Sequence, residues 1–366
     1  MNSRRLSILA FCLFNAWLLS FAYEGKVLYA VLDARAMESA PLIRSAMLAH
    51  AAGLFFCGIP VRNGALAGKV MVLYTVVCLA GSSLFFFPAV FLWPVSLLII
   101  AFSGGIWIAC WAFYYRSFST VRERMSVIAA SIAGSTALMA AVDLAAVCVH
   151  PAAGLAVSLL FLAASCCCIL RCRPAGTDEP PVPGTAPLQI PPFRALLLLC
   201  LFIIAVTVTS GLMFQVVNPA FRQLGLLPAL YGEIPYMAAM LIAARLPRQF
   251  SRGYLLYTAL AMIGFGFLAF MAFDRSTLSY LIVNTLLLGA FGISDLFWWS
   301  ILGEMLDLYR NPSRILGRVL SVNVAGVLLG EMISGRLQES GSDGLPAAVA
   351  LASVCSAVII LPVLYH

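Results

Sequence analysis

Apolar and polar positions alternate along this chain in long blocks. Stretches of about 20 mostly apolar residues, the length with which an α-helix crosses a bilayer, recur throughout the sequence between short polar gaps. The twelve stretches that we predict to be membrane-spanning helices are residues 6–32, 42–60, 67–88, 91–115, 125–148, 151–170, 195–221, 226–244, 254–273, 277–302, 319–335 and 345–365. The pattern therefore predicts an all-α membrane protein with twelve transmembrane helices.

The polar gaps differ in their charge. All but six of the chain's 22 Lys and Arg residues lie near the N-terminus or in gaps that follow an even-numbered segment. The six on the opposite side are Lys26, Arg35, Arg44, Arg222, Arg275 and Arg336. Because the loops on the cytoplasmic side carry the excess of Lys and Arg, we expect a multi-pass protein of the cell (cytoplasmic) membrane. Its N- and C-termini are both expected in the cytoplasm.

The longest polar gap, residues 171–194, is rich in proline and follows the sixth segment. A stretch of this composition does not pack a core and is typical of a semi-rigid linker. It divides the chain into an N-terminal six-helix half (residues 1–170), a cytoplasmic linker (171–194) and a C-terminal six-helix half (195–366).

The composition agrees with the membrane class. Of the 366 residues, 63% are hydrophobic and 10% are charged, and the mean hydropathy is +1.01. A soluble domain carries roughly 25% charged residues. The net charge of +7 is explained by the topology, because the basic residues form no stripe that would fit a nucleic acid.

The residues that carry enzyme or metal chemistry do not form a recognisable motif. The sequence contains no Gly-x-Ser-x-Gly, phosphate-binding loop or His-Glu-x-x-His, so no enzyme is predicted. His50 and His150 have no second ligand in register, and the eleven cysteines show no metal-binding spacing, so we expect no metal and no cofactor. The cysteines are interpreted as packing residues, with S-acylation at a membrane edge as the alternative.

The arrangement of six plus six segments, cytoplasmic ends and a central linker resembles the major facilitator superfamily (MFS) over the whole chain. This resemblance implies two six-helix halves around a central cavity with a binding site near the midplane. It implies a secondary transporter that moves a small solute by alternating access. In the loop where that family carries glycine and an acidic-basic pair, this chain has Gly58, Arg62, Gly68 and Lys69 without the acidic residue.

A second resemblance concerns residues 295–330. The run Asp-Leu-Phe-Trp-Trp-Ser-Ile-Leu-Gly-Glu-Met-Leu-Asp, followed by Asn311-Pro312 and by Gly326 and Gly330, resembles the MFS-like membrane half of bacterial LuxR-type regulators. In those regulators a helix-turn-helix DNA-binding domain follows the last span, and such a domain is absent from the sequence as given. The resemblance implies an alternative function as a membrane-embedded ligand sensor, and we expect this chain to contact no nucleic acid.

The seventh segment carries a polar stripe. Thr207, Gly211, Gln215, Asn218 and Arg222 share one helix face at 3.6 residues per turn. In a membrane such a face contacts protein or a water-filled cavity. We predict that Thr207, Gln215 and Asn218 bind substrate, while hydrogen bonding between helices is the alternative.

Asn284 and Asp295 share a face of the tenth segment and are also predicted to bind substrate. An ionised carboxylate inside the membrane costs about 3 kcal/mol, so an Arg, water, a proton or a cationic ligand must offset the charge of Asp295. Trp107 and Trp111 of the fourth segment are predicted to stack on a ligand, with core packing as the alternative.

Four further carboxylates lie toward the external side: Glu24, Asp143, Glu233 and Glu331. If they converge, they form proton or charge sites in a negative outer cavity, whereas separate solvated helix ends would have no such role. The expected partners of the protein are a small-molecule substrate or ligand and the lipid bilayer.

Overall fold

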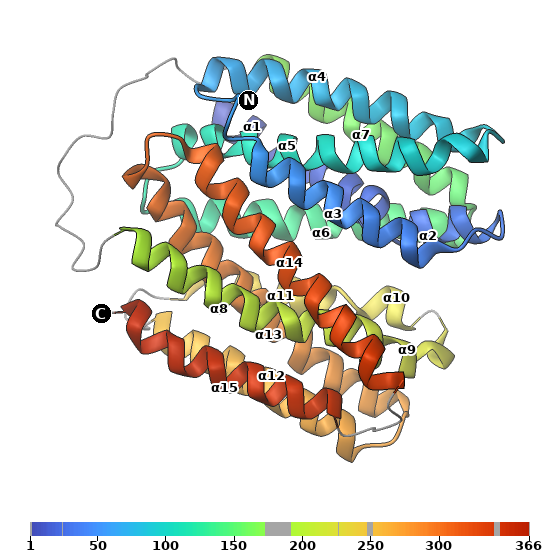
Figure 1. The fold of residues 1–366 in the computed structure, drawn as a ribbon, viewed down its shortest axis with the longest axis vertical. Coiled ribbons are helices and arrows are strands. Elements are labelled where there is room, and N and C mark those ends of the chain that lie inside the picture. The colour runs from blue at the N-terminus through green and yellow to red at the C-terminus, as the bar shows by residue number, and fades with distance from the viewer. Residues whose placement is uncertain are drawn as a thin grey trace. The chain divides into compact units, whose positions relative to one another are not determined.

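The computed structural model describes residues 2–23, 25–172, 192–225, 227–246, 252–339 and 345–365. These ranges are helical apart from short turns and contain no β-strand (Figure 1). Within them, nine helices are long and apolar enough to cross a membrane. Further helices occupy the second, eighth and twelfth predicted segments. The prediction of an all-α membrane fold with twelve helical segments is confirmed.

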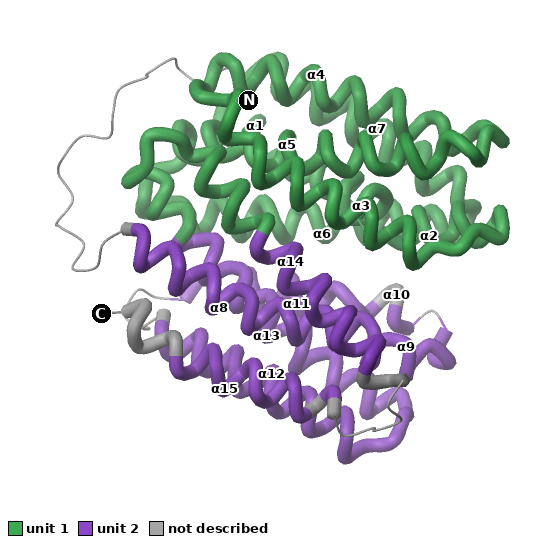
Figure 2. Tube along the Cα trace, viewed as in Figure 1, with its two compact units in different colours: residues 1–182, 302–321 green, residues 183–301, 322–366 purple. Residues whose placement is uncertain are grey.

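The chain divides into two compact units (Figure 2). Unit 1 comprises residues 1–182 and 302–321, and unit 2 comprises residues 183–301 and 322–366. The connection between the tenth and eleventh predicted segments thus belongs to unit 1. Most of the predicted linker lies outside the described residues, and the division of the chain at this linker remains a prediction.

Unit 1 contains the first seven helices, which are α1 (Ser3–Trp17), α2 (Lys26–Asp33), α3 (Ser39–Phe56), α4 (Gly64–Ser83), α5 (Trp93–Phe118), α6 (Arg124–Cys148) and α7 (Pro151–Arg171). The first predicted segment, 6–32, is therefore two helices. A π-helical turn at Leu18–Ala22 leads from α1 to the break before α2. Gly25 lies so close to the Ser20 carbonyl that a Cβ would overlap it, and this close approach requires glycine.

The helix starts of unit 1 follow local sequence signals. The Asn63 side chain accepts a hydrogen bond from the Leu66 N–H (2.8 Å) at the start of α4. The His150 ring accepts one from the Ala152 N–H (3.1 Å) at the start of α7, where Pro151 occupies the first turn. Both contacts satisfy backbone donors that have no partner inside the helix.

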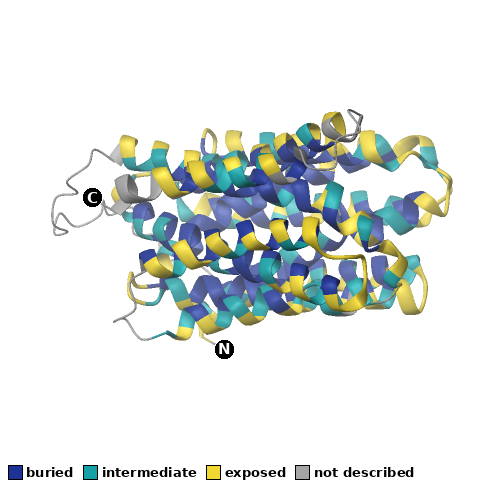
Figure 3. Cartoon of the chain, turned by 90° about the horizontal axis from the view of Figure 1, so that it is seen from below, coloured by how far each residue is buried: buried dark blue, intermediate teal, exposed yellow. Residues whose placement is uncertain are grey.

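The core of unit 1 is aromatic. Trp17, Trp107 and Trp111 are fully buried, and the rings of Phe14 and Trp107 stack with centroids 3.8 Å apart and an interplanar angle of 3°. Helices α3 and α5 pack in close contact because Gly105 leaves no room for a Cβ beside the backbone of α3. Buried and exposed residues occupy different faces of the helices, as expected for spans with a protein side and a lipid side (Figure 3).

Unit 2 contains the later helices, which are α8 (Pro192–Leu212), α9 (Asn218–Ala220), α10 (Leu227–Tyr231), α11 (Ile234–Arg245), α12 (Arg252–Ala272), most of α13 (Thr277–Met305), most of α14 (Pro312–Glu339) and α15 (Leu345–Tyr365). Two predicted segments are interrupted: the seventh becomes α8, a π-helical turn and α9, and the eighth becomes α10 and α11. Gly326 and Gly330 of α14 face α8 with no space for a Cβ, which agrees with close helix packing at this pair.

Candidate functional site

In unit 1, Asp143 of α6 faces Lys26, the first residue of α2. The Lys26 Nζ lies 3.4 Å from Asp143 Oδ2, and the side chains are 44% and 7% exposed, respectively. The other oxygen, Oδ1, is buried and has no hydrogen-bond partner among the described residues. The sequence placed Asp143 on the same side as the basic residues Lys26 and Arg222 but did not indicate which carboxylate each would contact. This carboxylate is therefore only partly satisfied by the protein.

In unit 2, Asp295 of α13 has a different environment. Its Oδ2 accepts a hydrogen bond from the Tyr236 hydroxyl (2.7 Å), and its Oδ1 accepts one from the Trp298 indole N–H (2.9 Å). Asp295 is half-buried. Neutral donors therefore take the place of the arginine that the sequence offered as one possible partner.

Helix packing positions Tyr236 for this contact. Gly292 of α13 lies so close to the Tyr236 carbonyl oxygen that a Cβ at Gly292 would overlap it. Our sequence interpretation missed Tyr236. The signal that could have indicated it is Pro235 in the first turn of α11, combined with a glycine about one turn before Asp295 on the facing helix.

Asn284 lies about three turns before Asp295 on α13 and is buried. Its side-chain amide donates to the Gly232 carbonyl (3.4 Å), just before α11. The neighbouring Thr285 hydroxyl lies 2.7 Å from the Tyr231 hydroxyl of α10. A line of polar contacts therefore joins α13 to α10 and α11 within unit 2.

The predicted substrate residues of the seventh segment occupy three environments. Thr207 is buried, donates to the Ile203 carbonyl (2.8 Å) and packs against Gly326 of α14, which agrees with the helix-packing alternative. Gln215 is half-buried in the π-helical turn, and Asn218 is exposed at the start of α9. Of the three predicted substrate residues, Gln215 and Asn218 therefore have exposed surface that a ligand can contact.

Trp107 and Trp111 of α5 lie inside unit 1 with their indole N–H groups satisfied. The Trp107 N–H donates to the Thr75 hydroxyl (3.0 Å), and the Trp111 N–H donates to the Ser7 hydroxyl (3.1 Å). Both side chains are fully buried. This environment agrees with the packing alternative that the sequence left open.

Two of the remaining candidate carboxylates lie in described parts of unit 2. Glu233 is half-buried and immediately precedes α11, whereas Glu331 is buried in α14. Glu24 lies outside the described residues. The described part of the chain includes no group of three or more His, Cys, Asp or Glu side chains that could hold a metal ion.

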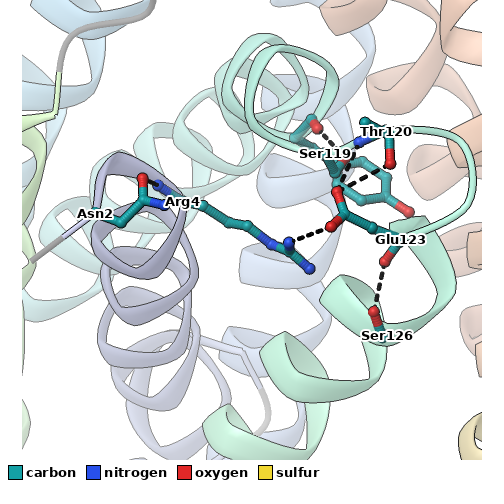
Figure 4. Close-up of polar contacts among 7 residues, drawn as sticks. Asn2, Arg4, Ser119, Thr120, Glu123 and Ser126 are labelled. Carbon is teal, nitrogen blue, oxygen red and sulfur yellow. Dashed lines mark hydrogen bonds and ion pairs between the residues drawn. The ribbon is translucent and has the colours of Figure 1, made fainter.

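Charged groups also meet where α5 ends and α6 begins in unit 1. Glu123 accepts from the Thr120 hydroxyl (2.9 Å) and pairs with Arg4 of α1 at 2.6 Å (Figure 4). Hydrogen bonds from the Thr120 hydroxyl and N–H, together with the one from Arg4, hold the pKa of Glu123 below its usual value. This cluster joins the start of α1 to the start of α6.

Arg124 anchors the connection between α13 and α14 to the rest of unit 1. Its side chain is 3% exposed, Nη1 donates to the Gly303 carbonyl (2.6 Å), and Nη2 pairs with Asp307 at 2.7 Å. The Asn311 amide adds a hydrogen bond to the Gly58 carbonyl (3.0 Å) after α3. The charge pattern of the sequence indicated only a topological role for Arg124, because its acidic partner lies far along the chain.

No protein-family model and no curated protein matches this sequence. Solved structures are similar in fold over the whole chain. The human organic anion transporter MFSD10 (TETRAN) has a TM-score of 0.72 and 14% sequence identity, with 100% of both chains covered. The fucose:proton symporter FucP of E. coli has a TM-score of 0.71 and 12% identity, with 99% of both chains covered.

A bacterial homologue of the iron transporter ferroportin, in an outward-facing state, has a TM-score of 0.69 and 15% identity, with 100% of both chains covered. FucP is itself described as a Major Facilitator Superfamily transporter. At these levels of identity the similarity establishes architecture. The chain therefore has the fold of the MFS transporters.

Proposed function

We propose that this protein is a secondary transporter that moves a small solute across a membrane by alternating access. The observation that carries the proposal is the MFS fold over the whole chain. Ionisable and amide side chains within the spans of each unit support it, because such residues are costly in a membrane and mark substrate or ion pathways. The proposal includes no enzymatic step and no resident cofactor.

Each unit offers its own candidates for contact with the solute. In unit 2 they are Gln215 and Asn218 of the interrupted seventh segment and the polar line formed by Asn284 and Asp295. In unit 1 they are Lys26 and Asp143. Interrupted helices support this choice, because their backbone leaves the regular hydrogen-bond pattern where a cavity is lined.

The proposed location is the cell membrane, with both termini in the cytoplasm. The charge distribution of the gaps supports this orientation, because positively charged loops are retained on the cytoplasmic side. Single cysteines placed near each terminus of a cysteine-free variant and labelled with a membrane-impermeant maleimide would test it. Labelling in intact cells would contradict the proposed orientation.

The test of transport is solute counterflow. A panel of small solutes would first be screened for thermal stabilisation of the purified protein, and a stabilising solute would then be tested in proteoliposomes. A transporter accumulates labelled solute transiently when the vesicles are preloaded with unlabelled solute. Stabilisation without counterflow would contradict transport and favour the ligand sensor that the resemblance to LuxR-type regulators implies.

A further inference from the structure

We propose that Lys26 and Asp143 of unit 1 form a binding site for the carboxylate group of an anionic solute, and that Asp143 takes up one proton when this solute binds. The inference rests on the proposed function, because it names the class of solute and the coupled ion. It is carried by the geometry of one incompletely satisfied ion pair.

The contact between Lys26 and Asp143 is long for an ion pair. The distance of 3.4 Å between Lys26 Nζ and Asp143 Oδ2 is longer than the roughly 2.7–2.9 Å of a strong charge-assisted hydrogen bond. Asp143 Oδ1 has no hydrogen-bond partner in the described part of the chain, although the side chain is only 7% exposed. Because buried polar atoms are nearly always satisfied, this oxygen is available to accept a proton.

The side chains of Lys26 and Asp143 differ in how far they are exposed. Asp143 is enclosed, whereas 44% of the Lys26 side chain is exposed. An ammonium group has three donors, and a single long contact to Asp143 leaves donors that an incoming carboxylate can use. The exposed partner is thus the cation, which fits an anionic solute better than a cationic one.

The site is held by backbone packing. Lys26 is the first residue of α2, and the close approach of Gly25 to Ser20 fixes where that helix begins. Val27 and Leu28, the next two residues of α2, are buried. The backbone from which the Lys26 side chain extends is therefore fixed before a ligand binds.

Other titratable groups near the site are either exposed or have contacts of their own. On α6 and on the elements packed against α2 and α6, these groups include Tyr23, Tyr29, Asp33, Arg44, His50, Cys148 and His150. The same elements also carry Arg4, Arg5, Cys12, Arg124, Cys166, Cys167, Cys168 and Arg171. The His50 ring is bonded to the Ala101 carbonyl (3.2 Å), the His150 ring caps α7, and Asp33 and Arg44 are exposed. Lys26 is the charged group that contacts Asp143 within the described ranges.

Charge balance links the proton to the anion. The ionised pair is neutral, and adding a carboxylate would leave one uncompensated negative charge beside the buried Asp143 carboxylate, which is costly. A proton from water on Asp143 restores neutrality and frees the Lys26 ammonium to bind the solute carboxylate. No covalent bond of the solute changes, and release of the solute returns the proton to water.

Benzoate is the probe for the test, with benzamide as the neutral analogue and benzylammonium as the cationic one. Binding to the purified protein in nanodiscs would be measured by thermal stabilisation between about pH 5.5 and 8, where benzoate remains ionised. Of the three probes, only benzoate should stabilise the protein. Its affinity should fall about tenfold per pH unit where the free protein holds Asp143 ionised, because one proton is taken up per anion.

Variants separate the role of Lys26, which binds the solute carboxylate, from that of Asp143, which takes up the proton. Lys26→Gln should weaken benzoate binding at least about tenfold, whereas Lys26→Arg, which keeps the charge, should retain it within about threefold. Asp143→Asn should bind benzoate with no pH dependence. Asp33→Asn, which changes an exposed carboxylate of α2, should behave as the wild type.

Three results would overturn the inference: no benzoate stabilisation of the wild type, equal affinity in Lys26→Gln and Lys26→Arg, or a pH dependence that persists in Asp143→Asn. These results concern binding alone. Failure of the proposed function is seen separately, as the absence of counterflow for a solute that binds. Folding of each variant is checked by its gel-filtration profile and its unfolding temperature without ligand.

Discussion

Asp143 in unit 1 and Asp295 in unit 2 are both carboxylates inside predicted spans, but their surroundings differ. Asp295 is half-buried, and each of its oxygens accepts a hydrogen bond from a neutral donor, Tyr236 or Trp298. Asp143 is almost fully buried, has one long contact to Lys26 and has an oxygen without a hydrogen-bond partner in the described ranges.

The difference shows that an acidic residue in a span is not by itself a site where proton uptake is coupled to solute binding. Asp295 is held in place by the protein, so we interpret it as a fixed group that orients other side chains or a solute. Asp143 is incompletely satisfied by the residues around it, so we interpret it as the carboxylate whose protonation changes. This contrast predicts effects of different sizes when each site is altered.

The largest effect is expected for Gly292→Ala. Because a Cβ at this position overlaps the Tyr236 carbonyl, α11 must move away from α13 and the bond from Tyr236 to Asp295 is lost. Overpacking of this kind costs about 1–3 kcal/mol, and loss of a hydrogen bond to a charged group adds to it. The free energy of unfolding in mixed micelles measures the effect.

Gly264→Ala is the matched control for this variant. A Cβ at Gly264 of α12 would meet only the end of the Leu351 side chain, at 3.7 Å. Alanine is favoured over glycine in a helix interior by about 1 kcal/mol, so the control should be neutral or stabilising. Equal destabilisation of the two variants would contradict the role of Gly292 in positioning Tyr236.

A smaller effect is expected for Tyr236→Phe. It removes one donor to the Asp295 carboxylate, and hydrogen bonds to charged groups contribute about 1.5–3 kcal/mol. Tyr231→Phe, which removes a 2.7 Å bond to the neutral Thr285 hydroxyl, should cost about 0.5–1.5 kcal/mol. If both variants lose the same free energy of unfolding, the Tyr236 hydroxyl does not support a charge.

The next comparison uses Asp295→Asn and Asp143→Asn. An amide replaces one acceptor oxygen with a donor, so Asp295→Asn should lower the free energy of unfolding by about 1 kcal/mol. Asp143→Asn should change it by less than about 0.5 kcal/mol, because neutralisation also removes the cost of burying an incompletely satisfied charge. A greater loss in Asp143→Asn than in Asp295→Asn would contradict the contrast.

The smallest effect concerns Glu123, an exposed carboxylate that is paired with Arg4 outside the spans. Its pKa is lower in the folded protein than its usual value, so its contribution to stability is present above that usual value. The contribution is lost as the pH falls through the folded-state pKa. Glu123→Gln should therefore reduce the dependence of the unfolding temperature on pH at the acidic end.

The helices were predictable because their signal is local. A run of about 20 apolar residues indicates a span without knowledge of its neighbours, and the helices α5, α6 and α7 begin and end close to the predicted limits. The breaks were harder to predict. The interruption of the first segment before α2 depends on how Gly25 approaches Ser20, which is a contact in space.

The candidate site was predictable in its residue types and not in its contacts. The sequence identified Asp143 and Asp295 because carboxylates are rare in spans. It offered Lys26 only as one of the basic residues on the same side as Asp143, and it did not indicate Tyr236, since each partner lies on another helix far along the chain. Trp107 was predicted to stack on a ligand, but the sequence could not show that Thr75 satisfies its indole N–H.

Proton uptake on benzoate binding tests the central contrast most directly. Benzoate would be added to weakly buffered protein at about pH 7, and the change in pH would be followed with an indicator dye. We predict uptake of up to one proton per bound benzoate in the wild type and in Asp295→Asn, and none in Asp143→Asn. Uptake that is retained in Asp143→Asn and lost in Asp295→Asn would contradict the assignment of the two carboxylates.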